Sequence, residues 1–186
     1  MPITDLFFTP LTPDIDLSSF DCDDKDINEF LKEDALNYQK EKMANTYVFL
    51  NDNGDVKAFF SISNDCLNDA GREDKAANQI FNRFHRKTKI PNEKRIRSYP
   101  SIKIGRLGVS KDEHRTGLAY ELMDFIKGYS IKDIKPACRL LLLDAYNKER
   151  QMKYYHANDF TCLDPDDEGE ERRLMYYNLQ RLDDFV

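Results

Sequence analysis

Gly117 and the polar residues just before it form the part of the sequence best suited to chemistry. A strand-like run ends at Val109, and a helix-like run with an apolar face begins at Leu118. The first amides of a helix lack intrahelical partners and lie at the positive end of its dipole, so they can hold a phosphate. Gly117 lets a ligand approach the backbone, and Arg115 and Thr116 add a positive charge and a hydroxyl donor. These residues indicate a pyrophosphate site.

A glycine that opens a helix is, taken alone, more typical of an ordinary turn. Neither of two known phosphate-binding patterns, GxxxxGK[ST] and GxGxxG, occurs in the chain. The interpretation therefore depends on the elements around the turn and on the residues they carry.

The expected elements follow a mixed pattern. Strands are predicted over residues 5–11, 47–50, 56–62, 102–109, 138–145, 160–163 and 174–179, and helices over 24–43, 75–89, 118–129 and 147–157. Asn51-Asp-Asn-Gly54 between two strand-like runs predicts a hairpin. Alternation of strands and helices in the second half predicts a mixed sheet with parallel crossovers. We expect one domain over residues 1–186, with 64–100 as a loop and helix inserted between central strands.

Composition excludes several classes of protein. A chain of 186 residues with 40% apolar residues can bury a core, and its 33% charged residues are mixed in sign, unlike a disordered chain. The cysteines form no CxxC and no Cys/His cluster, so we expect free, mostly buried thiols and no metal. The N-terminal residues do not resemble a signal peptide, and no apolar run has membrane length. A cytoplasmic protein without a membrane partner is expected.

Charge is unevenly distributed along this chain of net charge −6. Residues 82–106 hold nine basic residues and one acidic residue, whereas residues 14–34 hold nine acidic residues and two lysines. The basic segment is either a site for an anionic partner or a solvated loop that balances acidic neighbours. The acidic total argues against a protein whose whole surface binds nucleic acid.

Residues 105–119 resemble motif A of the GNAT superfamily of N-acetyltransferases. The match reads Gly105-Arg-Leu-Gly-Val109 and then His114-Arg-Thr-Gly-Leu-Ala119. His114 stands where the family has arginine or glutamine, and Arg115 can supply the missing charge. The resemblance implies an α/β (α+β) GNAT fold. That fold has a mixed, mostly antiparallel central sheet of about six to seven strands flanked by helices, with a parallel, splayed strand pair at the acetyl-CoA site.

The resemblance also implies how acetyl-CoA would bind. Backbone amides of the motif would hold the pyrophosphate, and the strand before it would pair with the pantetheine arm. The backbone N–H of Val109 or a neighbour would stabilise the oxyanion. The cofactor-binding residues implied in this way are Leu107, Gly108, Val109, His114, Arg115, Thr116, Gly117, Leu118 and Ala119.

Residues 143–160 are similar to a second GNAT segment, in which a strand, an asparagine and a helix are followed by an aromatic pair and a glycine. The resemblance implies that Tyr155 is the catalytic residue that protonates the departing CoA thiolate, and that Asn147 is a cofactor-binding residue opening the helix. A packed aromatic is the alternative for Tyr155, and Asn147 is a candidate N-cap in either case. Asp159 replaces the usual glycine before Phe160, so a different turn is expected there.

Phe20-Asp-Cys22 and Ile27-Asn-Glu-Phe-Leu31 resemble the N-terminal signature of a GNAT subgroup that includes the tRNA-acetylating toxins of toxin–antitoxin pairs. The implied function is transfer of an acetyl group from acetyl-CoA to a primary amine of a small molecule, a peptide or an aminoacyl-tRNA. Two alternatives stay open: a toxin acetylating aminoacyl-tRNA, with an antitoxin as partner, and a non-catalytic module that binds CoA or a peptide. A homodimer is also compatible with the resemblance.

The acceptor amine must be neutral to attack the thioester. With a pKa near 10.4, a lysine amine is almost entirely charged at pH 7, whereas an α-amine with a pKa of about 7.7–8.0 is roughly ten to twenty per cent neutral. No carboxylate lies in a motif that would identify it as the general base. The sequence therefore slightly favours a less basic acceptor amine, or a base that acts through water.

Overall fold

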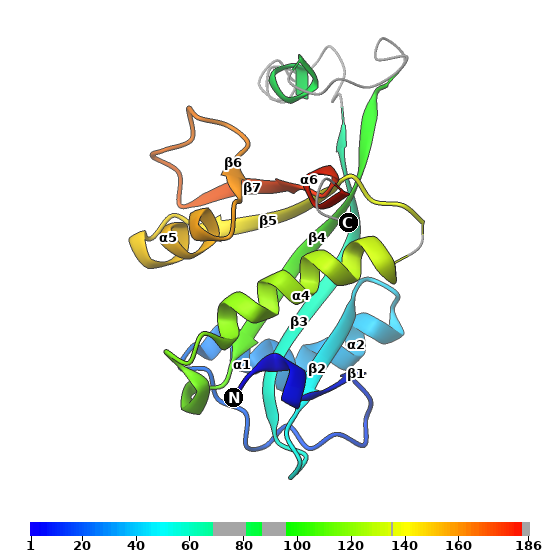
Figure 1. The fold of residues 1–186 in the computed structure, drawn as a ribbon, viewed down its shortest axis with the longest axis vertical. Coiled ribbons are helices and arrows are strands. Elements are labelled where there is room, and N and C mark those ends of the chain that lie inside the picture. Colours follow the sequence, from blue (N-terminus) through cyan, green and yellow to red (C-terminus); the bar gives the residue numbers. More distant parts are fainter. Residues whose placement is uncertain (69–80, 87–95, 135, 184–186) are drawn as a thin grey trace. The chain divides into compact units, whose positions relative to one another are not determined.

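The computed structural model describes residues 1–68, 81–86, 96–134 and 136–183 (Figure 1). Its strands form one sheet in the order β1-β2-β3-β4-β5-β7-β6. Strands β4 and β5 run parallel, whereas β1–β2, β2–β3, β5–β7 and β6–β7 pair antiparallel. The strands are β1 (Phe7–Pro10), β2 (Asn45–Leu50), β3 (Val56–Asn68), β4 (Ser98–Val109), β5 (Leu140–Tyr146), β6 (Thr161–Cys162) and β7 (Arg172–Asn178).

Apart from the helical residues 81–86 between β3 and β4, the helical elements precede β1 and β2 and follow β4, β5 and β7. They are η1 (Ile3–Asp5), α1 (Lys25–Glu29), the π-helical turn η2 (Phe30–Asp34), α2 (Ala35–Lys40), η4 (Lys111–Glu113), α4 (Leu118–Lys132), α5 (Glu149–Ala157) and α6 (Gln180–Asp183). The chain forms two compact units: Met1–Asn64 with Ile104–Tyr129, and Asp65–Lys103 with Ser130–Val186. We describe each unit by itself, and the expectation of one domain over residues 1–186 stays a prediction.

Unit 1 has a sheet with a helix on each face (Figure 1). The α4 face is aromatic: Phe125 lies 4.7 Å from the ring of Phe8 on β1 and 4.9 Å from that of Phe49 on β2. The opposite face packs against α1, η2 and α2 through a second apolar cluster. Its buried members are Leu11, Phe20, Phe30, Leu31, Ala35, Val48, Val56 and Phe59. Apolar side chains point to both faces of these strands, so both faces of the sheet in unit 1 are buried.

Two local features of unit 1 follow from particular residues. The hairpin predicted at Asn51–Gly54 is confirmed, because Gly54 has a φ of +84° and donates to the Asn51 carbonyl at 2.9 Å. The predicted helix over 24–43 starts with Asp24, whose side chain accepts from the Ile27 amide, but it ends at Lys40 and contains η2.

Unit 2 is built around β5. Its run Leu140–Leu143 is at most 2% exposed, because β4 pairs with it on one side and β7 on the other. Residues 81–86 are helical and place Phe84 5.0 Å from the ring of Tyr99. These rings belong to the buried apolar cluster of unit 2, which contains Leu67, Phe81, Phe84, Tyr99, Leu140, Leu142 and Leu163.

Several predicted boundaries are wrong. Strand β3 continues to Asn68 and β4 begins at Ser98, so both ends of the predicted insertion 64–100 belong to strands. The predicted helix 75–89 is helical over 81–86, and its remaining residues lie outside the described ranges. The first predicted strand is shorter, because residues 3–5 form η1. The other strands and helices shift by one to three residues at their ends.

Candidate functional site

Gly108 lies near the end of β4, where the strand passes over the apolar cluster of unit 1. A Cβ at this position would lie 2.8 Å from Cε1 of Phe59 and 3.0 Å from Cγ2 of Ile27. Packing therefore requires a glycine here, whatever the position binds. Because strand side chains alternate, Leu107 and Val109 lie on the other face of β4.

Residues 110–117 form the β4–α4 turn, and its backbone presents unpartnered amides. Arg115 has a φ of +68° and Gly117 a φ of +96°. Among the residues the structure describes, neither the Arg115 amide nor the Gly117 amide has a hydrogen-bond partner. A Cβ added to Gly117 would meet nothing within 4 Å, so the glycine is needed for its φ and the space beside it is open. Free amides at the start of a fifteen-residue helix are suited to an anion.

Thr116 caps α4 within the turn itself. Its Oγ1 donates to the Glu113 carbonyl at 2.8 Å and accepts from the Leu118 amide at 3.3 Å. The Thr116 amide donates to the same Glu113 carbonyl at 3.3 Å. In this conformation the Thr116 hydroxyl donates within the turn, and a ligand would have to replace that bond to receive it.

His114 links the turn to its two flanks. Its Nε2 lies 3.2 Å from the carbonyl oxygen of Val109, and its Nδ1 lies 3.9 Å from Oδ2 of Asp23. The ring can thus donate to the end of β4, and a protonated ring would also pair with Asp23.

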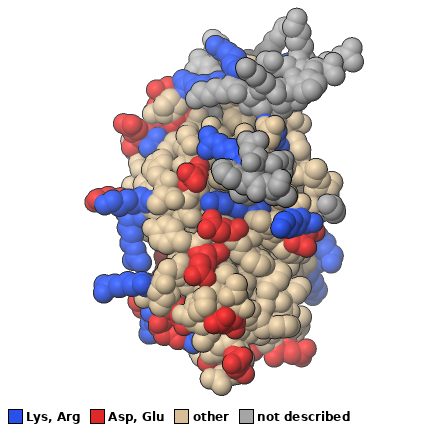
Figure 2. Space-filling model, viewed as in Figure 1, with Lys and Arg blue, Asp and Glu red and all other residues tan. Residues whose placement is uncertain are grey.

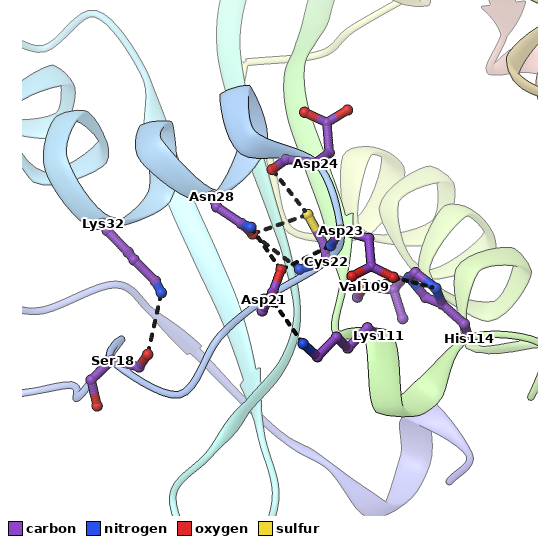
Figure 3. A network of polar contacts seen from close by, with 10 residues as sticks. All are labelled: Ser18, Asp21, Cys22, Asp23, Asp24, Asn28, Lys32, Val109, Lys111 and His114. Atoms are coloured by element: carbon purple, nitrogen blue, oxygen red, sulfur yellow. Dashed lines mark hydrogen bonds and ion pairs between the residues drawn. The ribbon is translucent and has the colours of Figure 1, made fainter.

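Asp21 lies at the centre of the polar network that holds this turn (Figure 3). Its Oδ2 pairs with Nζ of Lys111 at 2.8 Å, and its Oδ1 accepts from Nδ2 of Asn28 at 2.8 Å and from the Asp23 amide at 2.9 Å. Asn28 in turn accepts from the amide and thiol of Cys22 at 3.0 and 3.2 Å. The Phe20-Asp-Cys22 signature in the sequence gives no indication of this contact.

The polar network changes the pKa of both Asp21 and Lys111. The Lys111 ammonium and the two amide donors hold the pKa of the Asp21 carboxyl well below its usual range. The same pairing raises the pKa of Lys111. Both groups are therefore charged at neutral pH, and the Lys111 charge is directed at Asp21.

Tyr155 lies on α5 in unit 2, with its ring between two aromatic neighbours. The rings of Tyr154 and Phe160 lie 5.1 and 6.1 Å away. Burial raises the pKa of Tyr155 to about 12, and no described residue pairs with its hydroxyl. The side chain is thus a packed aromatic that also keeps a protonated hydroxyl available as a donor.

The turn after α5 has the conformation that a glycine would take. Asp159 has a φ of +63°, the Asp159 amide donates to the His156 carbonyl at 3.0 Å, and the Phe160 amide donates to the Tyr155 carbonyl at 3.0 Å. The expectation of a different turn, based on the missing glycine, finds no support in this geometry. Asp and Asn tolerate this region better than other side chains do.

Asn147 does not cap α5, contrary to the prediction. The helix begins at Glu149 with Lys148 as its N-cap residue. The Nδ2 of Asn147 instead donates to the carbonyls of Glu168 and Glu170 at 2.8 and 2.9 Å. Asn147 therefore fixes the acidic loop between β6 and β7 to the end of β5.

The described part of the basic segment is largely balanced within the chain. Ion pairs join Arg83 to Asp164 and Asp166, Lys103 to Asp144, and Arg106 to Asp26. Four of the nine basic residues, Lys87, Lys89, Lys94 and Arg95, lie outside the described ranges. On the face drawn in Figure 2, acidic and basic side chains of the described residues are interspersed. For these residues the balancing interpretation is favoured.

Within the described ranges, no group of three or more His, Cys, Asp or Glu side chains could hold a metal ion. No helix there combines the length and apolar character needed to cross a bilayer. The four cysteines are free, but Cys66 is exposed and the other three are only partly buried, so the expectation of mostly buried thiols is wrong.

The β4–α4 turn belongs to unit 1, and Tyr155 and Asn147 belong to unit 2. Within unit 1 the structure brings the motif A residues together around the end of β4 and the start of α4. Their roles in binding acetyl-CoA, and the alignment of the acyl carbon with Tyr155, stay predictions.

Comparison with known proteins shows the fold. Neither a protein-family model nor a curated protein matches the sequence. AtaTR bound with AcCoA has a TM-score of 0.69 at 20% identity, covering 98% of each chain. AtaT complexed with acetyl-methionyl-tRNAfMet has a TM-score of 0.68 at 21% identity, covering 97% of this chain and 99% of that one. A tyrosine-to-phenylalanine mutant of KacT has a TM-score of 0.68 at 19% identity, covering 98% and 99%. The predicted GNAT fold is confirmed.

Proposed function

We propose that this chain is an acetyl-CoA-dependent N-acetyltransferase that moves the acetyl group to a primary amine by direct attack. The observation that carries the proposal is the pair of unpartnered amides, of Arg115 and Gly117, beside open space at the start of α4. The same fold occurs in AtaTR bound with AcCoA, which supports a nucleotide thioester as the anion. The amides would hold its diphosphate, with Arg115 adding charge at the same turn.

The strand before the turn would receive the pantetheine arm. The end of β4 supplies backbone groups on the face opposite Gly108, and Val109 is the expected oxyanion donor. Leu118 and Ala119 follow as the first residues of α4, and His114 steadies the carbonyl of Val109.

The reaction forms an N–C bond and breaks the C–S bond of the thioester. The neutral amine attacks the carbonyl carbon, the oxygen becomes an oxyanion, and CoA leaves as a thiolate that ends as a thiol with the proton the amine loses. With a pKa of about 12, Tyr155 stays protonated throughout the working range. A thiol has a pKa near 8.5, so Tyr155 is the weaker acid. Its role is therefore to donate a hydrogen bond to sulfur as charge develops, and to pass on the amine's proton.

Calorimetry with acetyl-CoA, followed by a thiol-release assay with mixed amines, tests this function. We expect the wild type to bind acetyl-CoA and to release CoA thiol with at least one amine. Tyr155→Phe should bind acetyl-CoA as the wild type does and turn over about a hundredfold more slowly, the lower end of the typical contribution of one acid–base group. Tyr154→Phe, on the same helix, is the matched control and should keep its turnover. Absence of binding at millimolar acetyl-CoA would refute the proposal.

The second candidate is a toxin that acetylates the amino acid on charged tRNA. The structure of AtaT complexed with acetyl-methionyl-tRNAfMet favours it, because its fold covers nearly the whole of this chain. The α-amine of an aminoacyl-tRNA also needs less help from a base than lysine does. Growth arrest on expression, relieved by Tyr155→Phe, together with salt-sensitive tRNA binding, would support this candidate.

A toxin of this kind would have an antitoxin partner. In one solved structure a tyrosine-to-phenylalanine mutant of the toxin AtaT, which has the same fold, is bound to the C-terminus of the antitoxin AtaR. We infer that a similar partner would suppress the growth arrest caused by this chain. A non-catalytic module is the remaining alternative, and it would bind acetyl-CoA without releasing thiol with any amine.

A further inference from the structure

We propose that Asp21 is a positioning residue for the β4–α4 turn, and that it acts through Lys111 without touching the ligand. The inference rests on the proposed function of that turn in binding acetyl-CoA. It adds a residue nearly one hundred positions away from Gly117 in sequence to the machinery of the site.

Asp21 holds Lys111 through both its backbone and its side chain. The Lys111 amide donates to the Asp21 carbonyl at 2.8 Å, and Nζ of Lys111 lies 2.8 Å from Oδ2 of Asp21. Two contacts to one residue fix its position and its orientation. Lys111 is therefore anchored six residues before Gly117.

The other side of Asp21 is itself fixed. Its Oδ1 accepts from Nδ2 of Asn28 on α1 and from the Asp23 amide, as Figure 3 shows. Asn28 uses its own Oδ1 to accept from the Cys22 amide at 3.0 Å. The carboxylate thus connects Lys111 to Asn28 of α1.

A second set of contacts joins the neighbouring turn residues, Ser110 and Asp112, to Lys57 on β3. The Ser110 amide donates to the Lys57 carbonyl at 2.8 Å, and Nζ of Lys57 lies 2.6 Å from Oδ2 of Asp112. Three consecutive residues are therefore tied down at the start of the turn. Thr116, in the later part of the turn, is held by bonds within the turn itself, from its hydroxyl at 2.8 Å and its amide at 3.3 Å to the Glu113 carbonyl. The left-handed conformation of Arg115 thus depends on where the first residues are held.

Charge and position have opposite effects at Asp21, which makes the proposal testable. A carboxylate near an anion site repels the anion, so simple electrostatics predicts that its removal tightens binding. If Asp21 positions the turn, its removal loosens the amides and weakens binding, because the ligand must then order them. Asp21→Asn can keep the contacts of Oδ1, while its NH₂ group cannot accept from Lys111.

The experiment compares the wild type with Asp21→Asn, Lys111→Met and Lys111→Arg. Acetyl-CoA affinity is measured by calorimetry at low and high salt, steady-state rates are measured against acetyl-CoA, and hydrogen exchange of residues 110–117 is followed without ligand. We expect Asp21→Asn and Lys111→Met to raise Kd and KM for acetyl-CoA about three- to tenfold, the loss typical of one ordinary hydrogen bond, because the Asp21–Lys111 pair is solvent-exposed, with little change in kcat. Lys111→Arg, which can still pair with Asp21, should keep most of the wild-type affinity for acetyl-CoA.

Lys25→Met is the matched control, because it removes the exposed Lys25–Glu29 pair in the same unit. It should leave affinity and exchange unchanged. Should Asp21→Asn fail to fold, hydrogen exchange of residues 110–117 in Lys111→Met carries the test, because loss of the lysine charge alone would weaken anion binding without loosening the free turn.

Unchanged or tighter acetyl-CoA binding by Asp21→Asn would overturn the proposal, and so would unchanged exchange of the turn. The exchange experiment separates this failure from that of the proposed function. If the wild type does not bind acetyl-CoA but exchange accelerates in Asp21→Asn, the acetyltransferase proposal fails and the positioning of the turn by Asp21 stands.

Discussion

Replacing Gly108 by alanine should destabilise unit 1 even if the position never touches a ligand. The new Cβ would lie 2.8 Å from Cε1 of Phe59, against a preferred separation of about 3.5–4.0 Å. Ile27 and Phe20 crowd the same methyl at 3.0 and 3.3 Å. Phe59 and Phe20 are both fully buried, so neither ring can move aside into solvent.

Overpacking of a well-packed core by one methyl typically costs about 1–3 kcal/mol. Three close contacts, two of them on fully buried aromatic rings, place Gly108→Ala in the upper half of that range, at about 2–3 kcal/mol. For a chain of 150–250 residues this corresponds to a fall in Tm of about 4–12 °C. Chemical denaturation gives the free energy, and hydrogen exchange of β3 and β4 shows whether the loss lies in unit 1.

Gly128→Ala is the matched control, because a Cβ there meets nothing within 4 Å and the residue lies inside α4. It should stabilise the protein by about 0.5–1 kcal/mol, as glycine-to-alanine changes in helices do. If Gly108→Ala unfolds at the same denaturant concentration as the wild type, our reasoning about the packing of β4 is wrong.

Three further predictions concern unit 2. Burial raises the pKa of Tyr155 to about 12 in the folded state, whereas a tyrosine in the unfolded chain has a pKa of about 10. The unfolded state therefore loses its proton first as pH rises, and the free energy of unfolding should fall by about 2–3 kcal/mol between pH 10 and 12. Tyr155→Phe should show a smaller fall in denaturant titrations, and an equal fall would contradict the raised pKa. Asp159→Gly should raise stability by up to about 1 kcal/mol in thermal unfolding, because φ is +63° there, whereas Asp159→Ala should lower it. Asn147→Ala removes the bonds to the Glu168 and Glu170 carbonyls and should cost about 1–2 kcal/mol and accelerate exchange in residues 164–171; unchanged exchange would mean that this loop is held elsewhere.

The elements that follow from local patterns were predictable. The Asn51–Gly54 hairpin needs only a positive φ at the glycine, and β5 needs only a continuous apolar run. The sequence did not indicate the last residues of β3 or the first residues of β4, because polar side chains lie on exposed positions there. Cys66 is exposed and Leu67 is buried at the end of β3, so the composition is typical of a loop while the backbone is still a strand.

The site was predictable in part. Gly117 and its neighbours were identified because a glycine opening a helix is a local signal. The role of Asp21 could not be found in this way, because its partner Lys111 is 90 residues away in sequence. The predicted start of α5 was wrong for a similar reason. The Asn147 side chain donates to carbonyls more than 20 residues further along the chain and so does not cap the helix.

The π-helical turn η2 means that this helix carries one residue more than α-helical geometry needs. The Ala35 amide donates to the Phe30 carbonyl, five residues back, so Ala35 is buried where a regular helix would place Asp34. A one-residue deletion normally rotates everything after it by about 100°. Deleting the exposed Glu33 should instead convert η2 into ordinary helix and leave α2 facing the core, with a Tm close to that of the wild type. The same deletion within α4 would turn Phe125 away from the sheet, so the two helices should differ sharply in their tolerance to shortening.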